Sequence, residues 1–119
     1  METTERQVKL LVLENGKCPF AAWYTGIKDT LTRARIAARI ARVQAGNPGD
    51  SKSVGEGVHE LRLDFGPGYR VYFALIGDTI VVLLVGGDKA TQEDDIERAQ
   101  TLWKENRANA ERFQRDFGG

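Results

Sequence analysis

Four stretches of the chain have apolar patterns typical of β-strands. Residues 8–13 carry apolar residues on both alternating sets and lead into Asn15-Gly16, so we expect a strand covered on both faces. The other three stretches are VHELRLDF, YRVYFALI and TIVVLLV. Only Gly66-Pro67-Gly68 and Gly77-Asp78 separate them, and such short connections join antiparallel neighbours.

Apolar residues spaced three and four apart predict helices in three other segments. The first helix is short, opens at Pro19 and has the apolar positions Phe20, Trp23 and Ile27. The second is capped by Asp29 or Thr30 and stops at Gly46. One of its arcs carries Ile36, Ile40 and Val43, and a nearly opposite arc carries Leu31, Ala34, Ala38 and Ala41. Both arcs are apolar enough to be packed.

The third helix is predicted at Thr91, which can cap a first turn rich in acidic residues. Its apolar stripe consists of Ile96, Ala99, Leu102 and Trp103, and Ala110, Phe113 and Phe117 extend it. We therefore expect residues 105–119 to form a C-terminal helical extension. The pattern leaves open whether the helix is continuous or breaks near Asn106 or Asn109.

The predicted order of elements, β-α-α-β-β-β-α, indicates an α+β fold with a small, mainly antiparallel four-stranded sheet packed by helices. The 119 residues are enough for about one domain, so residues 1–119 are expected to form a single unit. The chain shows neither a secretory signal nor an apolar run of roughly 20 residues that could span a membrane. With a single cysteine, Cys18, and one histidine, it has too few ligands for a structural zinc site. We expect a cytoplasmic protein without a cofactor, a metal ion or a membrane partner.

The charges balance over the whole chain but not along it. Seventeen basic residues offset 17 acidic ones, so no net charge attracts the protein to nucleic acid. Between Lys28 and Tyr72, however, eight basic residues accompany five acidic ones, and an acidic patch follows at residues 93–97. A focused basic surface on a neutral protein is therefore expected.

A basic stripe follows one surface of the predicted second helix. Its members are Lys28, Arg35, Arg39 and Arg42. Lys52 adds a further charge in the glycine-rich link at residues 46–57. The stripe is either a solvated helix face or a contact surface for RNA or a protein partner, and the pattern alone does not choose.

The turn at residues 66–68 sets the faces of the predicted hairpin. If Phe65 pairs with Tyr69, Arg62 lies opposite Tyr72, and Asp64 opposite Arg70. Alternation then places His59, Leu61, Leu63, Phe65, Tyr69, Val71, Phe73 and Leu75 on the core side. The other side carries Glu60, Arg62, Asp64, Arg70, Tyr72 and Ala74.

This polar side of the hairpin is the best candidate for chemistry. Arg62 and Arg70 present forked donors suited to phosphate oxygens, and Tyr72 offers a ring for stacking or a hydroxyl group. Lys89 follows the last strand in GGDK and could reach the same place. Such a cluster suits RNA cleavage without a metal ion, in which a 2′-hydroxyl attacks the adjacent phosphorus. The alternative is an ordinary surface ion pair of Arg62 with a neighbouring carboxylate.

His59 and GGDK have simpler interpretations. Alternation puts His59 on the core side, so we expect a packed, hydrogen-bonded side chain rather than a general base. GGDK lacks the remaining residues of a phosphate-binding loop and is interpreted as a turn into the last helix.

Four motifs together resemble a known superfamily. They are F-x-x-W in the first helix, R-x-R-I-x-x-R-I in the second, GNPGDSKSVGEGVHELRLDFGPGYRVYF and LLVGGDKATQEDDIERA. They are similar to the RelE/ParE superfamily of toxin-antitoxin toxins, and within it to the HigB-like group of phage-derived addiction-module killer proteins. The resemblance covers roughly Val8 to Lys104 and leaves out Glu105 to Gly119.

The resemblance implies a toxin that a cognate antitoxin, commonly a helix-turn-helix protein, holds inactive. RelE-type members cut mRNA at the ribosome, whereas ParE-type members poison DNA gyrase. By the resemblance, Arg70 contacts the scissile phosphate, Arg62 takes part in proton transfer, and Lys89 is a general acid or charge stabiliser. RelE-type toxins also carry a base-stacking tyrosine in the final helix, where this chain is acidic near Asp95. Tyr72 or Tyr69 are the available substitutes.

The resulting hypothesis is a translation-inhibiting toxin that cleaves mRNA on the ribosome without a metal ion. Its catalytic candidates are Arg62, Arg70, Lys89 and Tyr72, and Arg35, Arg39, Arg42 and Lys52 are candidates for contact with RNA or antitoxin. The alternatives are a ParE-like gyrase inhibitor without nuclease activity and a folded but inactive relic.

Overall fold

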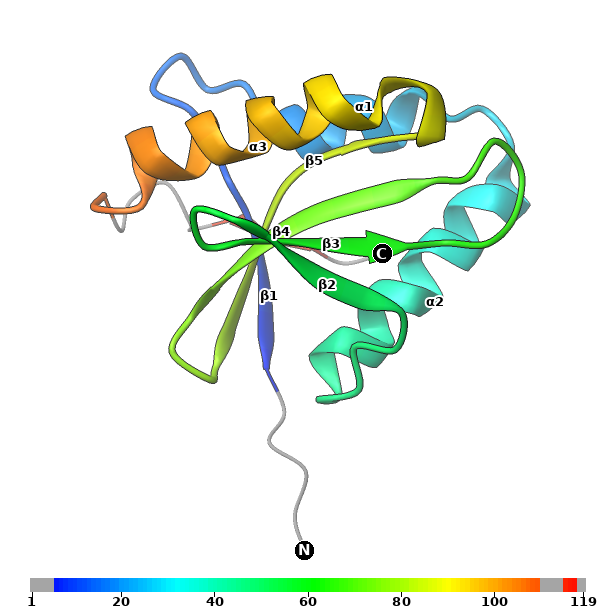
Figure 1. Ribbon diagram of the computed structural model, residues 1–119, viewed down its shortest axis with the longest axis horizontal. Coiled ribbons are helices and arrows are strands. Elements are labelled where there is room, and N and C mark those ends of the chain that lie inside the picture. Colours follow the sequence, from blue (N-terminus) through cyan, green and yellow to red (C-terminus); the bar gives the residue numbers. More distant parts are fainter. Residues whose placement is uncertain (1–5, 110–114, 118–119) are drawn as a thin grey trace, which may run out of the picture.

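A six-stranded mixed sheet forms the centre of the protein (Figure 1). The structure is a computed structural model, and it describes residues 6–109 and 115–117. The elements are β1 (Gln7–Leu10), α1 (Pro19–Gly26), α2 (Thr30–Gln44), β2 (Ser51–Gly55), β3 (Val58–Arg62), β4 (Arg70–Ile76), β5 (Ile80–Gly87), the 3-10 turn η1 (Lys89–Thr91), α3 (Gln92–Asn106) and β6 (Arg115–Asp116). None of the described helices is long and apolar enough to cross a membrane.

The strands lie in the order β2-β3-β4-β5-β1-β6. β1 runs parallel to β5, and every other neighbouring pair is antiparallel. The fold is therefore α+β, as predicted, but the expected count of four strands is wrong. The sequence pattern identified β1, β3, β4 and β5 and missed the two strands at the edges of the sheet.

The missed edge strand β2 lies in the segment that was interpreted as a glycine-rich link. It pairs with β3, with Lys52 opposite Glu60 and Ser53 opposite His59. Its sequence, SKSVG, carries a single apolar residue, and none of its residues is fully buried. An edge strand that buries no face has no need of apolar alternation, so periodicity could not reveal it.

The expected C-terminal helical extension is also corrected. α3 ends at Asn106, and Arg115 and Asp116 form β6 against β1. Phe117 then packs edge-on against the rings of Phe20 and Tyr24, at centroid distances of 5.6 and 5.4 Å. The predicted stripe positions Ala110 and Phe113 lie outside the described residues.

The sheet is covered on both faces, so the protein has two cores. Figure 1 shows α2 in cyan and α3 in gold on separate sides of the strands. The first core joins α1 and α2 to the sheet through Phe20, Tyr24, Ile36, Ile40, Val43, Leu61, Leu63, Val71, Phe73, Val81 and Leu83, among others. The second joins α3 to the opposite face through Val58, Tyr72, Ala74, Val82, Leu84, Val85, Ala99 and Trp103, with Leu11. The period-two face assignment of β3 and β4 is thus confirmed, because their odd and even residues enter different cores.

The register of the β3–β4 hairpin differs from the expected one by two residues. Arg62 lies opposite Arg70, and Glu60 opposite Tyr72. The pairing closes at Leu63, whose N–H donates to the Tyr69 carbonyl at 3.0 Å, so the connection is longer than the expected three-residue turn. Positive φ angles of 58° at Gly66 and 78° at Gly68 allow this connection to turn back. A shift of two residues leaves every side chain on its predicted face.

Helix α2 begins and ends close to the predicted positions. The Asp29 side chain caps it by accepting from the Leu31 N–H, and the chain leaves the helix through Gly46 at a φ of 90°. Only the arc of Ile36, Ile40 and Val43 is buried. The expectation that the opposite arc also packs is wrong, because Leu31 is 68% exposed and its alanines face outward.

Candidate functional site

Three of the predicted cationic residues meet where the β3–β4 turn approaches η1. Arg62 and Arg70 are direct partners across the two strands and therefore share a face. The Lys89 N–H donates to the Pro67 carbonyl at 3.4 Å, which fastens η1 to the turn. Both Lys89 and the Arg70 guanidinium flank Gly68, so closely that a Cβ at Gly68 would lie 3.2 Å from Lys89 Cβ and 3.4 Å from Arg70 Nη1. We call Arg62, Arg70 and Lys89 the cationic site.

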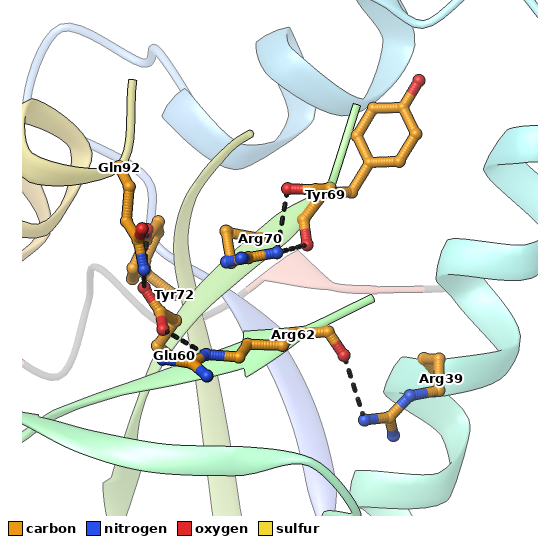
Figure 2. Close-up of polar contacts among 8 residues, drawn as sticks. Arg39, Glu60, Arg62, Tyr69, Arg70, Tyr72 and Gln92 are labelled. Atoms are coloured by element: carbon orange, nitrogen blue, oxygen red, sulfur yellow. Dashed lines mark hydrogen bonds and ion pairs between the residues drawn. The ribbon is translucent and has the colours of Figure 1, made fainter. Parts of the chain in front are cut away.

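Glu60 lies beneath Arg62 and is the centre of a polar network (Figure 2). Arg62 Nε donates to Glu60 Oε1 at 3.0 Å. The other oxygen, Oε2, accepts from the Tyr72 hydroxyl at 3.0 Å and from Gln92 Nε2 at 2.8 Å. The residue is 0% exposed, so β3, β4 and α3 together enclose its carboxylate. We call this group the Glu60 network.

The network keeps Glu60 ionised. Burial alone would raise the pKa of Glu60, but the hydrogen bonds from Gln92, Arg62 and Tyr72 outweigh burial and lower it. Burial, together with the negative charge of Glu60 and the hydrogen bond to it, raises the pKa of Tyr72. The hydrogen bond to Glu60 likewise raises the pKa of Arg62. The site therefore holds a buried anion beneath a permanently charged guanidinium.

Arg62 forms an ion pair with Glu60, which is the alternative to a catalytic role that the sequence pattern left open. The Arg62 side chain is nevertheless 35% exposed, whereas that of Glu60 is 0% exposed. Only Nε contacts the carboxylate, and within the described residues no hydrogen bond holds the two Nη atoms. The buried carboxylate thus fixes the inner edge of the guanidinium and leaves donors on its outer edge.

Arg70 is held differently. Its Nη1 donates to the carbonyl oxygens of Gly68 at 2.9 Å and Tyr69 at 3.2 Å, so the side chain bends back over the turn (Figure 2). Its Nε is buried and has no hydrogen-bond partner among the described residues. The two arginines therefore lie side by side on one face, but each is bound to its own partner rather than both facing a single pocket.

Tyr72 does not have the role that was expected of it. It is 0% exposed, belongs to the second core and gives its hydroxyl to Glu60. Its ring is therefore inaccessible to a nucleotide base. The error arises because α3 covers the face that was expected to be open. Tyr69, on the other face as alternation predicted, is half-buried and packs edge-on against Trp23 at 6.2 Å.

Two consecutive glycines let helices approach both sides of β5 beside the site. A Cβ at Gly86 would overlap the Trp23 ring of α1. A Cβ at Gly87, the partner of Arg70, would overlap the Asp95 carboxylate of α3. Asp95 also accepts from the Thr91 hydroxyl, while Asp88 caps η1. GGDK is thus a turn into the last helix, as predicted, and its glycines are required by packing.

The remaining candidate cations lie apart from the cationic site. Arg35, Arg39 and Arg42 belong to α2, which packs on the other face of the sheet. Arg39 is engaged with the backbone, donating to the carbonyls of Pro48 at 3.1 Å and Arg62 at 3.4 Å. Lys52 is closer, because β2 places it opposite Glu60, and it is exposed.

Gln92 belongs to this region and was not singled out from the sequence. It lies on α3, and no local pattern ties it to Glu60, which lies 32 residues earlier in the chain. The alternation of residues did place Glu60 on the same strand face as Arg62. Its burial could be recognised only once α3 was known to cover it.

His59 packs against an aromatic ring. It stacks on Phe73, its partner across the strands, at a centroid distance of 5.3 Å, as predicted. The predicted hydrogen bond of its side chain is not found among the described residues. Burial, followed by the charge of Arg6, lowers its pKa. Within residues 6–109 and 115–117, no three His, Cys, Asp or Glu side chains form a group that could hold a metal ion.

Known proteins place the chain in a family. The family model described as phage derived protein Gp49-like matches residues 28–104. A Haemophilus influenzae protein described as uncharacterized (strain ATCC 51907 / DSM 11121 / KW20 / Rd) is 49% identical over 86 residues, which cover 72% of this chain and 87% of that protein. No solved structure matches the chain. The chain therefore belongs to the family of Gp49-like phage-derived proteins, and the matched segment includes α2, the cationic site and all but the last two residues of α3.

Proposed function

We propose that this protein is the toxin of a toxin-antitoxin module and that it inhibits translation by cleaving mRNA on the ribosome without a metal ion. Support comes from the sequence resemblance to the RelE/ParE superfamily and its HigB-like group, and from membership of the Gp49-like family. The observation that carries the mechanism is the pairing of Arg62 with Arg70 beside Lys89, with Arg62 oriented by the buried Glu60 carboxylate.

The reaction assigns one role to each cation. The 2′-hydroxyl of a nucleotide attacks the adjacent phosphorus, its proton passes to solvent, and the bond to the 5′ oxygen breaks. Arg70 binds the phosphate oxygens through the fork of its guanidinium, which requires it to exchange its two carbonyl partners for the substrate. Lys89 protonates the leaving oxygen.

Arg62 stabilises the negative charge that develops on the phosphorane. The resemblance gives the matching residue a part in proton transfer, but the hydrogen bond to Glu60 raises the pKa of Arg62 and opposes loss of a proton. Its outer Nη atoms are the donors that remain for substrate. Preorganised donors of this kind contribute most where water is excluded. In this proposal the ribosome excludes water from the site.

Tyr72 acts in this proposal as a positioning residue. It holds Glu60, which in turn holds Arg62, and it does not contact RNA. Base stacking is therefore left to the ribosome or to other residues. The proposed partners are the ribosome, its mRNA and a cognate antitoxin, which we expect to be a helix-turn-helix protein, and the proposed place of action is the cytoplasm.

Expression without antitoxin tests this function in cells. We expect growth arrest with a prompt fall in methionine incorporation, while thymidine incorporation continues. Arg70→Ala should abolish the arrest, and Arg98→Ala, an exposed arginine on α3, should not. DNA breakage with an SOS response would instead favour a ParE-like gyrase inhibitor, and normal growth with the unaltered protein would indicate an inactive relic.

A further inference from the structure

A second basic feature lies on the face of the sheet that α2 covers. A groove of about 370 Å³ runs between α2 and the end of β3, and we call it the α2 groove. Its apolar lining is formed by Ala38, Leu63 and Phe65. Leu63 and Phe65 alternate with Arg62, so the groove and the cationic site are on opposite faces of the sheet.

Arginines from three positions of α2 line this groove. Arg39 is committed to the backbone carbonyls of Pro48 and Arg62, which makes it part of the wall. Arg35 lies over the Phe65 ring, with its guanidinium carbon 3.8 Å from the centroid. Stacking uses the face of a guanidinium and leaves its N–H edge free to donate.

Arg42 supplies the least constrained charge. It is exposed, and within the described residues no hydrogen bond or ion pair involves its side chain. Its positive charge, together with burial, contributes to lowering the pKa of Arg39, so the two cations repel each other. An anion bound between them would relieve this repulsion.

The positive charge around α2 is only partly balanced, by Asp64 in the groove lining and by Asp50, whose charge acts on Arg39. Residues 28–45 contain five basic residues and one acid, Asp29, whose carboxylate is engaged in capping the helix. The exposed arc of the same helix is formed by Leu31, Ala34, Ala38 and Ala41. A basic surface with an apolar floor and small residues beside it is complementary to a chain that carries both carboxylates and an apolar side chain.

We propose that the α2 groove binds an acidic segment of a protein partner. One leucine-sized or aromatic side chain of that segment packs on Ala38, Leu63 and Phe65, and carboxylates on either side of it pair with Arg35 and Arg42. This proposal does not depend on nuclease activity, because it uses no residue of the cationic site.

The groove is less suited to nucleic acid. Arg35 covers one face of the Phe65 ring, so a base could not stack on that face. A phosphate backbone would also leave the apolar floor uncovered, whereas a peptide side chain fills it.

Fluorescence anisotropy with the full chain tests the proposal. The probe is a fluorescein-labelled 12-residue peptide in which one leucine is flanked on both sides by glutamates, and the reference peptide has glutamine in place of each glutamate. We expect the acidic peptide to bind at least about tenfold more tightly than the reference, and to weaken steeply as salt is raised. Equal affinities, or no binding of either peptide, would overturn the proposal.

Variants then locate the binding. The double change Arg35→Gln with Arg42→Gln should weaken the acidic peptide at least about tenfold, whereas Arg98→Gln, the same change on α3, should have no effect. Ala38→Gln places a longer side chain on the floor without adding charge and should also weaken binding. Because these positions are exposed, thermal unfolding should be unchanged and reports directly on any loss of fold.

Two further outcomes discriminate against the proposal. Competition by a 12-nucleotide RNA at equal affinity would assign the groove to nucleic acid, and self-association that fails in the double variant would assign it to a second copy of the chain. Arg70→Ala should bind the acidic peptide like the unaltered protein. Loss of RNA cleavage in Arg70→Ala therefore does not contradict the docking proposal. Loss of peptide binding in the double variant likewise does not contradict the proposed RNA cleavage.

Discussion

The Tyr72 hydroxyl lies 3.0 Å from Glu60 Oε2 inside the second core, where both side chains are fully buried. This contact links the structural and the proposed catalytic parts of the molecule. Glu60 is the only buried charged residue among those that the structure describes, and its second oxygen holds Arg62. A buried carboxylate is costly unless its oxygens are hydrogen-bonded, so the network is tied to the fold.

Replacing Glu60 tests this coupling. Glu60→Gln removes the charge and one acceptor, and we expect the free energy of unfolding to fall by about 2–3 kcal/mol, because hydrogen bonds to charged groups are the stronger ones. Tyr72→Phe removes one donor and should cost about 1–2 kcal/mol. Glu97→Gln, an exposed change on α3, should stay within about 0.5 kcal/mol. Urea unfolding measures all three free energies. If Glu60→Gln unfolds with an unchanged free energy, the Glu60 network does not stabilise the fold.

The pH dependence of stability follows from the same residue. The pKa of Glu60 is lower in the folded chain than its ordinary value of 4.5, so the unfolded chain takes up the proton first as pH falls. The stabilisation is therefore complete above that value and is lost as pH falls through the folded pKa. Glu60→Gln should reduce the loss of stability on acidification below about pH 5.

Gly86 should not tolerate a side chain. The added methyl group of Gly86→Ala overlaps the Trp23 ring, and we expect a loss of about 1–3 kcal/mol together with a change in tryptophan fluorescence as the ring is displaced. Gly26→Ala is the matched control, because nothing lies within 4 Å of the added atom. If both variants unfold at the same urea concentration, the close packing of α1 on β5 is not as described.

His59 provides a clean titration because the chain has no other histidine. Burial, with the charge of Arg6, lowers its pKa, so NMR should show a midpoint below the ordinary 6.5. The unfolded chain then binds the proton more readily, and stability should be lost as pH falls from about 6.5 through the folded midpoint. His59→Phe keeps a ring against Phe73 and should flatten the curve in that window. A midpoint at or above 6.5 would contradict the packed position.

The sequence predicted those parts of the fold in which packing imposes a period. α2, β3, β4 and β5 bury alternate or helically spaced residues, and their positions and faces follow from that spacing. β2 was not predicted because an exposed edge strand needs no such pattern. β6 was not predicted because a strand of two residues is too short to show one. The hairpin register depended on how far the connection after Leu63 extends, which glycine content alone does not fix.

The candidate site was predicted only as far as one strand face can show. Arg62, Arg70 and Glu60 were placed together by alternation, and the turn brought Lys89 beside them. Alternation does not reveal what covers a face, so Tyr72 was expected to be exposed although α3 buries it. Gln92 reaches the site by tertiary packing, for which the sequence carries no local signal.

Cleavage of a defined mRNA on purified ribosomes tests the central claim most directly. The unaltered protein should cut the message in the ribosomal A site, and Arg70→Ala should slow cleavage by a factor on the order of 100 or more while thermal unfolding stays unchanged. Arg62→Ala should slow cleavage as well, but it should also lower the stability, because it removes a hydrogen bond from the buried Glu60 carboxylate. Arg98→Ala should cut at the full rate. Undiminished cleavage by Arg70→Ala, or an intact message with the unaltered protein, would contradict the assignment of the cationic site to RNA cleavage.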